Sequence, residues 1–284
     1  MLIASSSKGD DSHNEPISKV MWYKVPGKKK LYHVLSVGLD GKMLVWKLDK
    51  DKNRLKLSKG YVLLAQHMPK SVKIKSSKRN PEMGVTSLDF SCVDEETFYI
   101  GSESGGMFRC SVNSQVSAGD STSSISLVDP VKLTFLPHCG PVYSVNSSPY
   151  HRNLFLSCSS DSTLRVHSIL QTQPVMVIEP ASGYLYTVRW SPTKPLVFAV
   201  TTQDGRALIY DLKKSQTTPA HVLEASPSKQ AVYVMEFNQK QRKFMATGDA
   251  VGVIKVWQLN DEITTESAAE RDILNSLADT SGQD

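Results

Sequence analysis

The residue types that most often carry catalysis or bind metals are present in this chain, but their spacing matches no familiar chemistry. The four cysteines stand at positions 92, 110, 139 and 158, with no CxxC pair and no histidine at the spacing of zinc ligands. The stretch GSESG at 101–105 carries Glu103 where a nucleophile elbow needs serine. No phosphate-binding GxxxxGKS/T loop, HExxH motif or dinucleotide fingerprint occurs. We therefore expect no enzyme, no cofactor, no metal site, and free thiols packed in strands instead of disulfides.

A strongly basic stretch offers a second kind of chemistry, the binding of an acidic partner. Residues 49–82 carry ten Lys or Arg against three Asp or Glu, whereas the net charge of the whole chain is only +5. No Phe, Tyr or Trp falls within residues 67–82, where such a ring would be needed to stack a nucleic-acid base. We expect a solvated loop that contacts an acidic protein surface, if it contacts anything, and neither nucleic acid nor membrane. Its basic residues are Lys70, Lys73, Lys75, Lys78 and Arg79.

The candidate reactive residues and the basic stretch must both be positioned by a unit that the chain repeats five times. Each unit joins an apolar strand to a second, alternating strand through a tight turn built on Gly, Asp or Ser. The residues that end the second strands are separated by 64, 57, 43 and 47 positions. Periods near 40 to 45 residues are typical of a WD-repeat β-propeller, with one four-stranded blade per repeat. The units end at Trp46, Cys110, His167, Tyr210 and Trp257. The sequence thus predicts an all-β fold of five recognisable blades, an incomplete set relative to a seven-bladed propeller.

A second short strand precedes each hairpin and alternates apolar and polar residues with a period of two. This is the pattern of a half-buried strand, here the innermost strand of each blade. Tryptophans end several of the alternating runs, and we expect Trp22, Trp46, Trp190 and Trp257 to be mostly buried. The five strands are Ile17–Trp22, Val85–Phe90, Val142–Ser147, Leu185–Trp190 and Val232–Phe237.

The turn residues have a structural explanation that outweighs a catalytic one. Asp-Gly pairs adopt the positive-φ geometry of a two-residue hairpin, and the carboxylate binds nearby backbone amides. We expect blade turns at Asp40 with Gly41, Asp161, Asp204 with Gly205, and Asp249, and a further turn near Ser104. His138 and His167 stand where a WD repeat places a histidine in its internal hydrogen-bond network, so we expect no catalytic or metal role for them.

The composition divides the chain into three parts. Residues 1–16 are predicted to be the remnant of a preceding blade and a linker, 17–260 to be the propeller blades, and 261–284 to be an acidic C-terminal tail. The tail holds seven acidic residues and one arginine; a frayed tail is preferred over the alternative of a short amphipathic helix. A Ser-rich insertion at 111–130 is expected to be mobile. The first apolar run is too short for a signal peptide and no window resembles a membrane span, which predicts a cytoplasmic protein.

Four segments together resemble the dynein intermediate chains. HCGPVYSVNSSPY at 138–150 resembles their H-x-GPVYS segment, and FYIGSESGGMFRCS at 98–111 is similar to a strand pair that ends on Cys instead of Trp. YLYTVRWSPTKPLVFAVTTQDGRALIYDL at 184–212 and SHNEPISKVMW at 12–22 follow the same family pattern. The segments cover most of residues 12–259. The closing blade at 234–259 is most similar to intermediate chains of the intraflagellar-transport dynein, the ciliary retrograde motor.

The resemblance implies a scaffold without chemistry of its own. It implies that the blades bind the dynein heavy chain and other dynein subunits, and that the protein acts at the cilium and its base, associated with the cytoskeleton. Family members carry an N-terminal extension that binds light chains and a propeller usually of seven blades. The five repeats here therefore imply a truncated form without the light-chain region. Two alternatives stay open: an axonemal dynein intermediate chain, and a generic WD-repeat adaptor in ubiquitin ligation or RNA handling.

Overall fold

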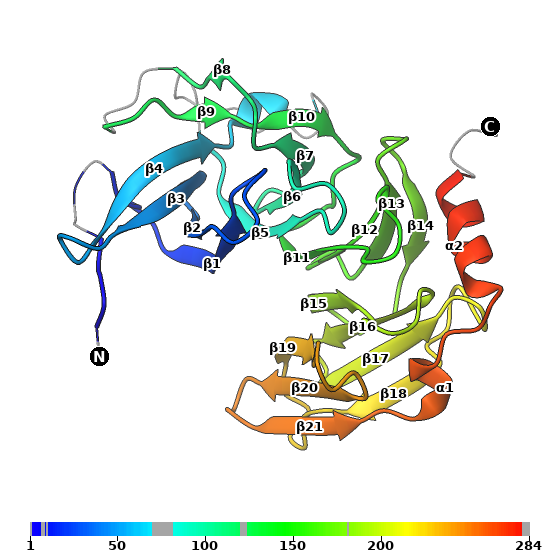
Figure 1. The fold of residues 1–284 in the computed structure, drawn as a ribbon. Helices are drawn as coiled ribbons and strands as arrows, with labels where there is room; N and C mark the ends of the chain where they lie inside the picture. The colour runs from blue at the N-terminus through cyan, green and yellow to red at the C-terminus, as the bar shows by residue number, and fades with distance from the viewer. Residues whose placement is uncertain are drawn as a thin grey trace.

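The polypeptide forms five antiparallel β-sheets that follow one another along an open arc (Figure 1). The computed structural model describes residues 2–6, 9, 11–69, 82–119, 124–180 and 182–279. We call the sheets blades 1 to 5 in chain order. The predicted all-β architecture of five blades is confirmed, and over the described residues the arc does not close into a ring.

Each blade runs from a strand near the centre of the arc to a strand at its outer edge (Figure 1). The hairpin connections keep neighbouring strands antiparallel. Blades 1 and 2 contain β1 (Ile17–Lys24), β2 (Tyr32–Gly38), β3 (Lys42–Asp49) and β4 (Arg54–Val62), then β5 (Val85–Phe90), β6 (Thr97–Ser102), β7 (Met107–Ser111) and β10 (Val131–Thr134). Blades 3 and 4 contain β11 (Val142–Ser147), β12 (Leu154–Ser159), β13 (Leu164–Ser168) and β14 (Pro174–Ile178), then β15 (Leu185–Trp190), β16 (Val197–Thr202), β17 (Arg206–Asp211) and β18 (His221–Glu224). Blade 5 contains β19 (Val232–Phe237), β20 (Phe244–Asp249) and β21 (Ile254–Gln258).

The second and third strands of every blade meet in the hairpins that the sequence predicted. The turns lie between β2 and β3, β6 and β7, β12 and β13, β16 and β17, and β20 and β21. Gly41 has φ +76° and Gly205 has φ +91°, the left-handed conformation that glycine adopts without steric cost. The local turn chemistry therefore sets the register of each hairpin.

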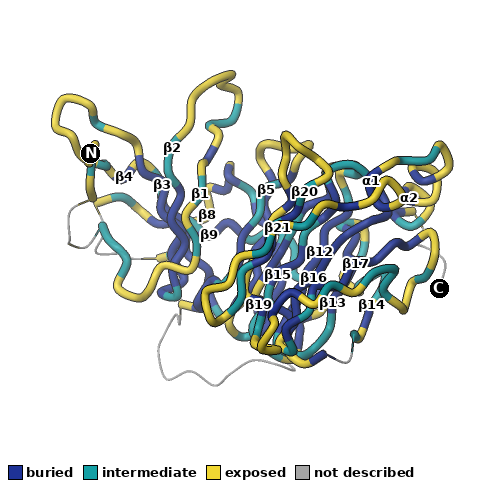
Figure 2. The backbone as a smooth tube through the Cα atoms, turned by 90° about the horizontal axis from the view of Figure 1, so that it is seen from below, coloured by how far each residue is buried: buried dark blue, intermediate teal, exposed yellow. Residues whose placement is uncertain are grey.

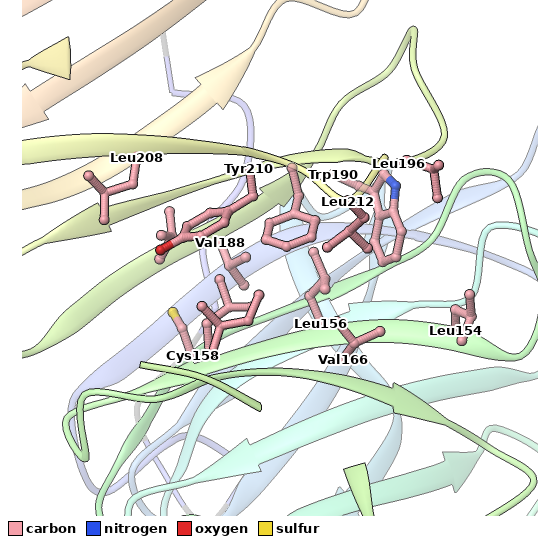
Figure 3. Packing of buried hydrophobic residues seen from close by; sticks show 14 of the residues in the cluster. Leu154, Leu156, Cys158, Val166, Val188, Trp190, Leu196, Leu208, Tyr210 and Leu212 are labelled. Atoms are coloured by element: carbon pink, nitrogen blue, oxygen red, sulfur yellow. The ribbon is translucent and has the colours of Figure 1, made fainter. Parts of the chain in front are cut away.

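The core lies between the blades and is built from alternating strand residues. Figure 2 shows the buried positions running along the strands and the exposed positions gathering in the connecting loops. Between blades 3 and 4, Leu156 and Val166 face Val188, Trp190 and other apolar residues (Figure 3). Burying one such side chain contributes about 1.5–3 kcal/mol. Packing of each blade face on its neighbour therefore holds the arc together.

The expectation of four mostly buried tryptophans was wrong for two of them, one in each end blade. Trp46 and Trp190 are buried, but Trp22 is 71% exposed and Trp257 is half-buried. In β1, Val20 and Trp22 hold the places that Met235 and Phe237 hold in β19, and those two residues pack on blade 4. Within the described part of the chain, no sheet lies on the corresponding side of blade 1. Trp22 is exposed because no blade of the described chain packs on that face.

Blade 5 leaves the matching face open at the other end of the arc. Ile209 of β17 is buried against blade 5, whereas its counterpart Val256 of β21 is 69% exposed. Ala207 is likewise buried, and its counterpart Ile254 is 76% exposed. Both ends of the arc therefore present apolar sheet faces of the type that pack together elsewhere in the fold.

The Ser-rich insertion is not a free loop over its described residues. It forms β8 (Val116–Ser117) and β9 (Val128–Asp129), and β9 pairs in parallel with β4 of blade 1. Leu127 is 3% exposed and packs against Trp46 and other apolar residues of blade 1. Apart from the insertion, a 3₁₀ turn at Ala65–His67 follows β4 of the same blade. For the described residues of the insertion, the expectation of mobility was wrong, because Leu127 packs on a blade distant in sequence.

The acidic segment after blade 5 folds into two helices, α1 (Asp261–Thr264) and α2 (Glu270–Asp279). Leu274 and Ala278 of α2 are buried against the core shared by blades 3 and 4, beside β14 (Figure 1). The expected frayed tail was therefore wrong for residues 261–279, since α2 buries an apolar stripe. The described helices include none long and apolar enough to span a membrane.

A buried lysine links these helices to blade 4. The Nζ of Lys194 lies 2.8 Å from the Asp211 carboxylate and 3.4 Å from that of Glu270. It also donates to the backbone carbonyl of Glu262, 2.9 Å away. Burial acts to lower the pKa of Lys194, but its hydrogen bond to Asp211 and the charges of both carboxylates raise it. Lys194 therefore stays charged and holds α1 and α2 against the blade.

The start of the chain runs beside blade 1. Ser5 forms a parallel bridge with Arg54 of β4, and its carbonyl accepts a hydrogen bond from the Leu55 amide. Ser5 therefore lies at the outer edge of blade 1, and the assignment of residues 1–16 to a preceding blade and a linker stays a prediction. The boundaries of the three parts remain a prediction.

Candidate functional site

The predicted turn aspartates bind the backbone of their own hairpins. Asp40 accepts from the Lys42 amide at 3.1 Å, and Asp161 accepts from the Thr163 amide at 3.0 Å. Asp249 accepts from the amide of Val253 at 2.8 Å. These carboxylates lie in different blades, so the structure does not bring them together into one site.

The Asp204 carboxylate binds two side chains of its own hairpin. It accepts from the Thr202 hydroxyl at 2.5 Å and forms an ion pair with Arg206. Burial acts to raise the pKa of Asp204, but hydrogen bonds from Arg206 and Thr202 lower it overall. The arrangement stabilises the hairpin of blade 4.

Blade 1 contains a hydrogen-bonded chain of four side chains from the loop before β1, from β2 and β3, and from the turn between them. His13 lies 2.9 Å from Asp40 through Nδ1 and 2.8 Å from the Ser36 hydroxyl through Nε2. The indole of Trp46 donates to the same hydroxyl at 2.7 Å. Burial acts to raise the pKa of Asp40, but the bond to His13 and two backbone amides lower it overall. The chain joins the loop before β1 to β2 and β3.

Blade 3 repeats this chain with histidine in place of tryptophan. His138 lies 2.9 Å from Asp161 through Nδ1 and 2.8 Å from the Ser157 hydroxyl through Nε2. His167 reaches the same hydroxyl through Nε2 at 2.8 Å. With the Nδ1 proton of His138 donated to Asp161, Ser157 donates to His138 and accepts the Nε2 proton of His167. His167 therefore supplies the donor that Trp46 supplies in blade 1.

The aspartate, histidine and serine of blade 3 resemble a hydrolase triad in composition only. Ser157 and His167 are both 0% exposed, and the hydroxyl is held on both sides by imidazoles. Burial holds the pKa of His167 well below its usual value, with the neighbouring His138 and Arg165 adding to the effect. Because no substrate reaches a fully buried hydroxyl, this network stabilises the blade and does not catalyse acyl transfer.

The remaining networks are simpler. In blade 5 the Trp257 indole donates to Thr247 at 2.9 Å, and the hydroxyl of Ser226 donates to Asp249 at 2.7 Å. The sequence indicated a network role for His138 and His167 but did not identify their partners. The repeated order of histidine, serine and aspartate in blades 1 and 3 is the signal that would have identified them.

Polar side chains of the inner strands line a cavity of about 560 Å³ at the centre of the arc. Arg189 forms an ion pair with Glu236 at 2.9 Å, and Asp89 accepts from the Asn146 amide at 3.0 Å. Lys19 donates to the Leu88 carbonyl at 2.6 Å. Arg189 and Asp89 are thus paired with other residues that line the cavity, and Lys19 with the neighbouring backbone.

The cysteines are free in the structure and only half of them are packed inside strands. Cys110 of β7 and Cys158 of β12 are buried, and burial raises the pKa of both thiols. Cys92 and Cys139 lie exposed in loops, which corrects the expectation that all four pack in strands. Over the described ranges, no three His, Cys, Asp or Glu residues gather closely enough to hold a metal ion.

The basic loop that was predicted to contact a partner lies outside the described residues. This applies to Lys70, Lys73, Lys75, Lys78 and Arg79. Its flanks are described: Pro69 follows the 3₁₀ turn, and Glu82 bridges to Leu64 of blade 1. A role in contacting a partner remains a prediction.

Comparison with known proteins adds what the geometry alone does not show. Residues 66–259 match the family model "Dynein axonemal intermediate chain 3 WD40 domain". Cytoplasmic dynein 2 intermediate chain 2 of Mus musculus is 41% identical over 270 residues, which are 94% of this chain and 50% of the relative. Its Homo sapiens counterpart is 40% identical over 275 residues, 95% of this chain and 50% of the relative. The chain thus spans about half the length of these two curated relatives.

A more distant relative comes from a flagellum. The 70 kDa intermediate chain of the flagellar outer arm dynein of Chlamydomonas reinhardtii is 25% identical over 271 residues, 94% of this chain and 42% of the relative. The matched domain and the five blades agree with the WD-repeat architecture predicted from the sequence. The chain belongs to the dynein intermediate chain family of WD40-repeat proteins.

Proposed function

We propose that this chain is a non-catalytic scaffold subunit of a dynein motor complex. Its blades bind the dynein heavy chain and support retrograde intraflagellar transport and cilium assembly. The observation that carries the proposal is the identity of 40–41% to cytoplasmic dynein 2 intermediate chain 2, spread over 94–95% of this chain. The protein then acts in the cytoplasm, at the cilium and its base, in association with the cytoskeleton.

The architecture supports a scaffold because it offers rigid surfaces instead of a reactive centre. Five packed blades hold their connecting loops in fixed positions on the two faces of the arc (Figure 2). The side chains that resemble a hydrolase triad lie inside blade 3, where Ser157 is fully buried. Broad surfaces of this kind suit the binding of other subunits.

A second candidate is an axonemal dynein intermediate chain. The matching family model is that of an axonemal chain, and Homo sapiens dynein axonemal intermediate chain 2 is 23% identical over 277 residues. The higher identity to the dynein 2 chains favours the transport motor. A generic WD-repeat adaptor has no comparable observation in its favour.

Affinity purification from ciliated cells tests the proposal. The full chain, tagged and expressed at low level, is recovered and its partners are identified by mass spectrometry. We expect the cytoplasmic dynein 2 heavy chain to be enriched over a tagged, unrelated WD-repeat protein. Recovery of axonemal heavy chains instead would support the second candidate. Recovery of ubiquitin-ligase or RNA-processing subunits without any dynein would contradict both.

A further inference from the structure

The inner strands of all five blades contain a bulge at the same place, and the side chain at that place differs between blades. The register of each inner strand shifts just after its first residue. A bulge redirects the side chain of the extra residue. The five residues at this position are Ser18, Thr86, Tyr143, Tyr186 and Tyr233.

In the first two blades the bulge residue joins one blade to the next. The hydroxyl of Ser18 donates to the Val85 carbonyl of blade 2 at 2.7 Å. The hydroxyl of Thr86 donates to the Val142 carbonyl of blade 3 at 2.6 Å. These two hydroxyls are therefore used in holding the fold together.

In the last three blades the bulge residues form an aromatic cluster. The rings of Tyr143 and Tyr186 stack with centroids 5.3 Å apart, and the ring of Tyr233 meets Tyr186 edge-on at 4.9 Å. Tyr143 is 37% exposed and Tyr233 is 54% exposed, with Tyr186 between them. We call these three residues the tyrosine cluster. A row of exposed rings on rigid strands is the kind of surface that concentrates binding energy in protein interfaces.

A fourth tyrosine stands beside the cluster on a loop that is itself fixed. The amide of Tyr184 donates to the Gln203 side chain at 3.1 Å, and the Gln203 amide donates to the Tyr184 carbonyl at 2.9 Å. Tyr184 is 45% exposed, and its proximity helps to raise the pKa of Tyr143. The surface is therefore organised before any partner arrives, which lowers the entropic cost of binding.

The chemistry of the cluster is that of uncharged hydrogen-bond donors on apolar rings. Among the described residues, no hydrogen bond reaches the hydroxyls of Tyr143, Tyr186 or Tyr233. Burial raises the pKa of Tyr143 and of Tyr186, with the neighbouring tyrosines adding to the effect. The hydroxyls of Tyr143 and Tyr186 therefore stay protonated and can donate to a partner.

We propose that the tyrosine cluster binds a proline-rich segment of a partner protein in the polyproline II conformation. Such a segment presents flat apolar rings to aromatic side chains and leaves its backbone carbonyls unpaired, so that tyrosine hydroxyls have acceptors to bind. A nucleic-acid strand would also stack on the rings, but its phosphates need cations, and the cations that lie over rings in the described part of the chain are at Tyr61 and Trp257, not at the cluster. The contact is separate from the heavy-chain role proposed above, and its test needs no dynein.

Fluorescence anisotropy of the full chain with fluorescein-labelled decaproline tests the proposal. We expect saturable binding, which a labelled Gly-Ser decapeptide does not show. Tyr186→Ala removes the central ring and should weaken binding about tenfold or more. Tyr233→Phe keeps the ring and removes one hydroxyl, and should weaken binding by about two- to tenfold. The second variant still decides the matter if Tyr186→Ala fails to fold.

Tyr32→Ala is the matched control, because Tyr32 is also 54% exposed but lies on β2, away from the bulge position. The affinity of the Tyr32→Ala variant for decaproline should equal that of the unaltered chain. The proposal is overturned if decaproline does not bind saturably, or if Tyr233→Phe and Tyr32→Ala bind it as tightly as the unaltered chain. It is also overturned if a ten-residue oligo(dT) binds more tightly and displaces decaproline from the same tyrosines.

Discussion

Replacing Lys194 by methionine should destabilise the protein far more than the loss of one surface charge. Its side chain is 6% exposed, and the two carboxylates beside it, Asp211 and Glu270, are 0% and 1% exposed. Methionine is of similar length but carries no charge, so both buried carboxylates lose their counter-ion. Removing one partner from a buried ion pair costs about 3–5 kcal/mol in the free energy of unfolding.

The loss should appear first in α2, because Glu270 belongs to this helix and Asp211 to a blade. Apart from the ion pair, α2 is held by the burial of Leu274 and Ala278. Burying a leucine contributes about 1.5–3 kcal/mol, which is no more than the expected loss. We therefore expect α2 to open before the blades unfold. A loss of about 3 kcal/mol corresponds to about a hundredfold faster hydrogen exchange of the amides in residues 270–279.

Urea unfolding and hydrogen exchange, followed by mass spectrometry, measure the two effects. Lys214→Met is the matched control: its side chain is 43% exposed and pairs with Glu262 at the surface, an interaction worth about 0–1 kcal/mol. Glu270→Gln should cost less than Lys194→Met, because Lys194 keeps Asp211 and no buried charge is left without a partner. The account of the C-terminal helices is refuted if Lys194→Met and Lys214→Met lower the free energy of unfolding equally.

Three further predictions concern the core, pH and the basic loop. Trp190→Ala should lower the free energy of unfolding by about 3–5 kcal/mol, whereas Trp22→Ala should change it by less than about 0.5 kcal/mol; equal losses in urea would contradict the burial pattern. Burial lowers the pKa of His138 and His167 in the fold, so the unfolded chain binds protons first and the melting temperature should fall as pH drops through about 6.5. His167→Phe should show a smaller drop between about pH 7.5 and 5.5, and an unchanged drop would assign the effect elsewhere. Replacing the five basic loop residues by Gln should leave the circular dichroism spectrum unchanged and weaken dynein recovery modestly, mainly at low salt, whereas loss of RNA binding in that variant would favour the adaptor. Those residues are Lys70, Lys73, Lys75, Lys78 and Arg79.

The strands and hairpins were predictable because their signals are local. Alternation with a period of two marks a strand, and an Asp-Gly pair such as Asp204-Gly205 marks a turn, without reference to any distant residue. Family membership was predictable for a related reason: the order of several short motifs along the chain carries more information than one WD repeat. These features depend on residues close together in sequence.

Burial and partnership were decided only by the tertiary structure. Trp22 and Trp190 end similar alternating runs, yet one is exposed and the other buried, because burial depends on whether another blade packs against the strand. The tail residue Leu274 is ordered since it meets a core built from blades 3 and 4. His167 completes a network whose other members lie 6 to 29 positions away in the chain. Strands and turns thus follow from local sequence, whereas the contacts between blades, which no short segment encodes, set the role of each side chain.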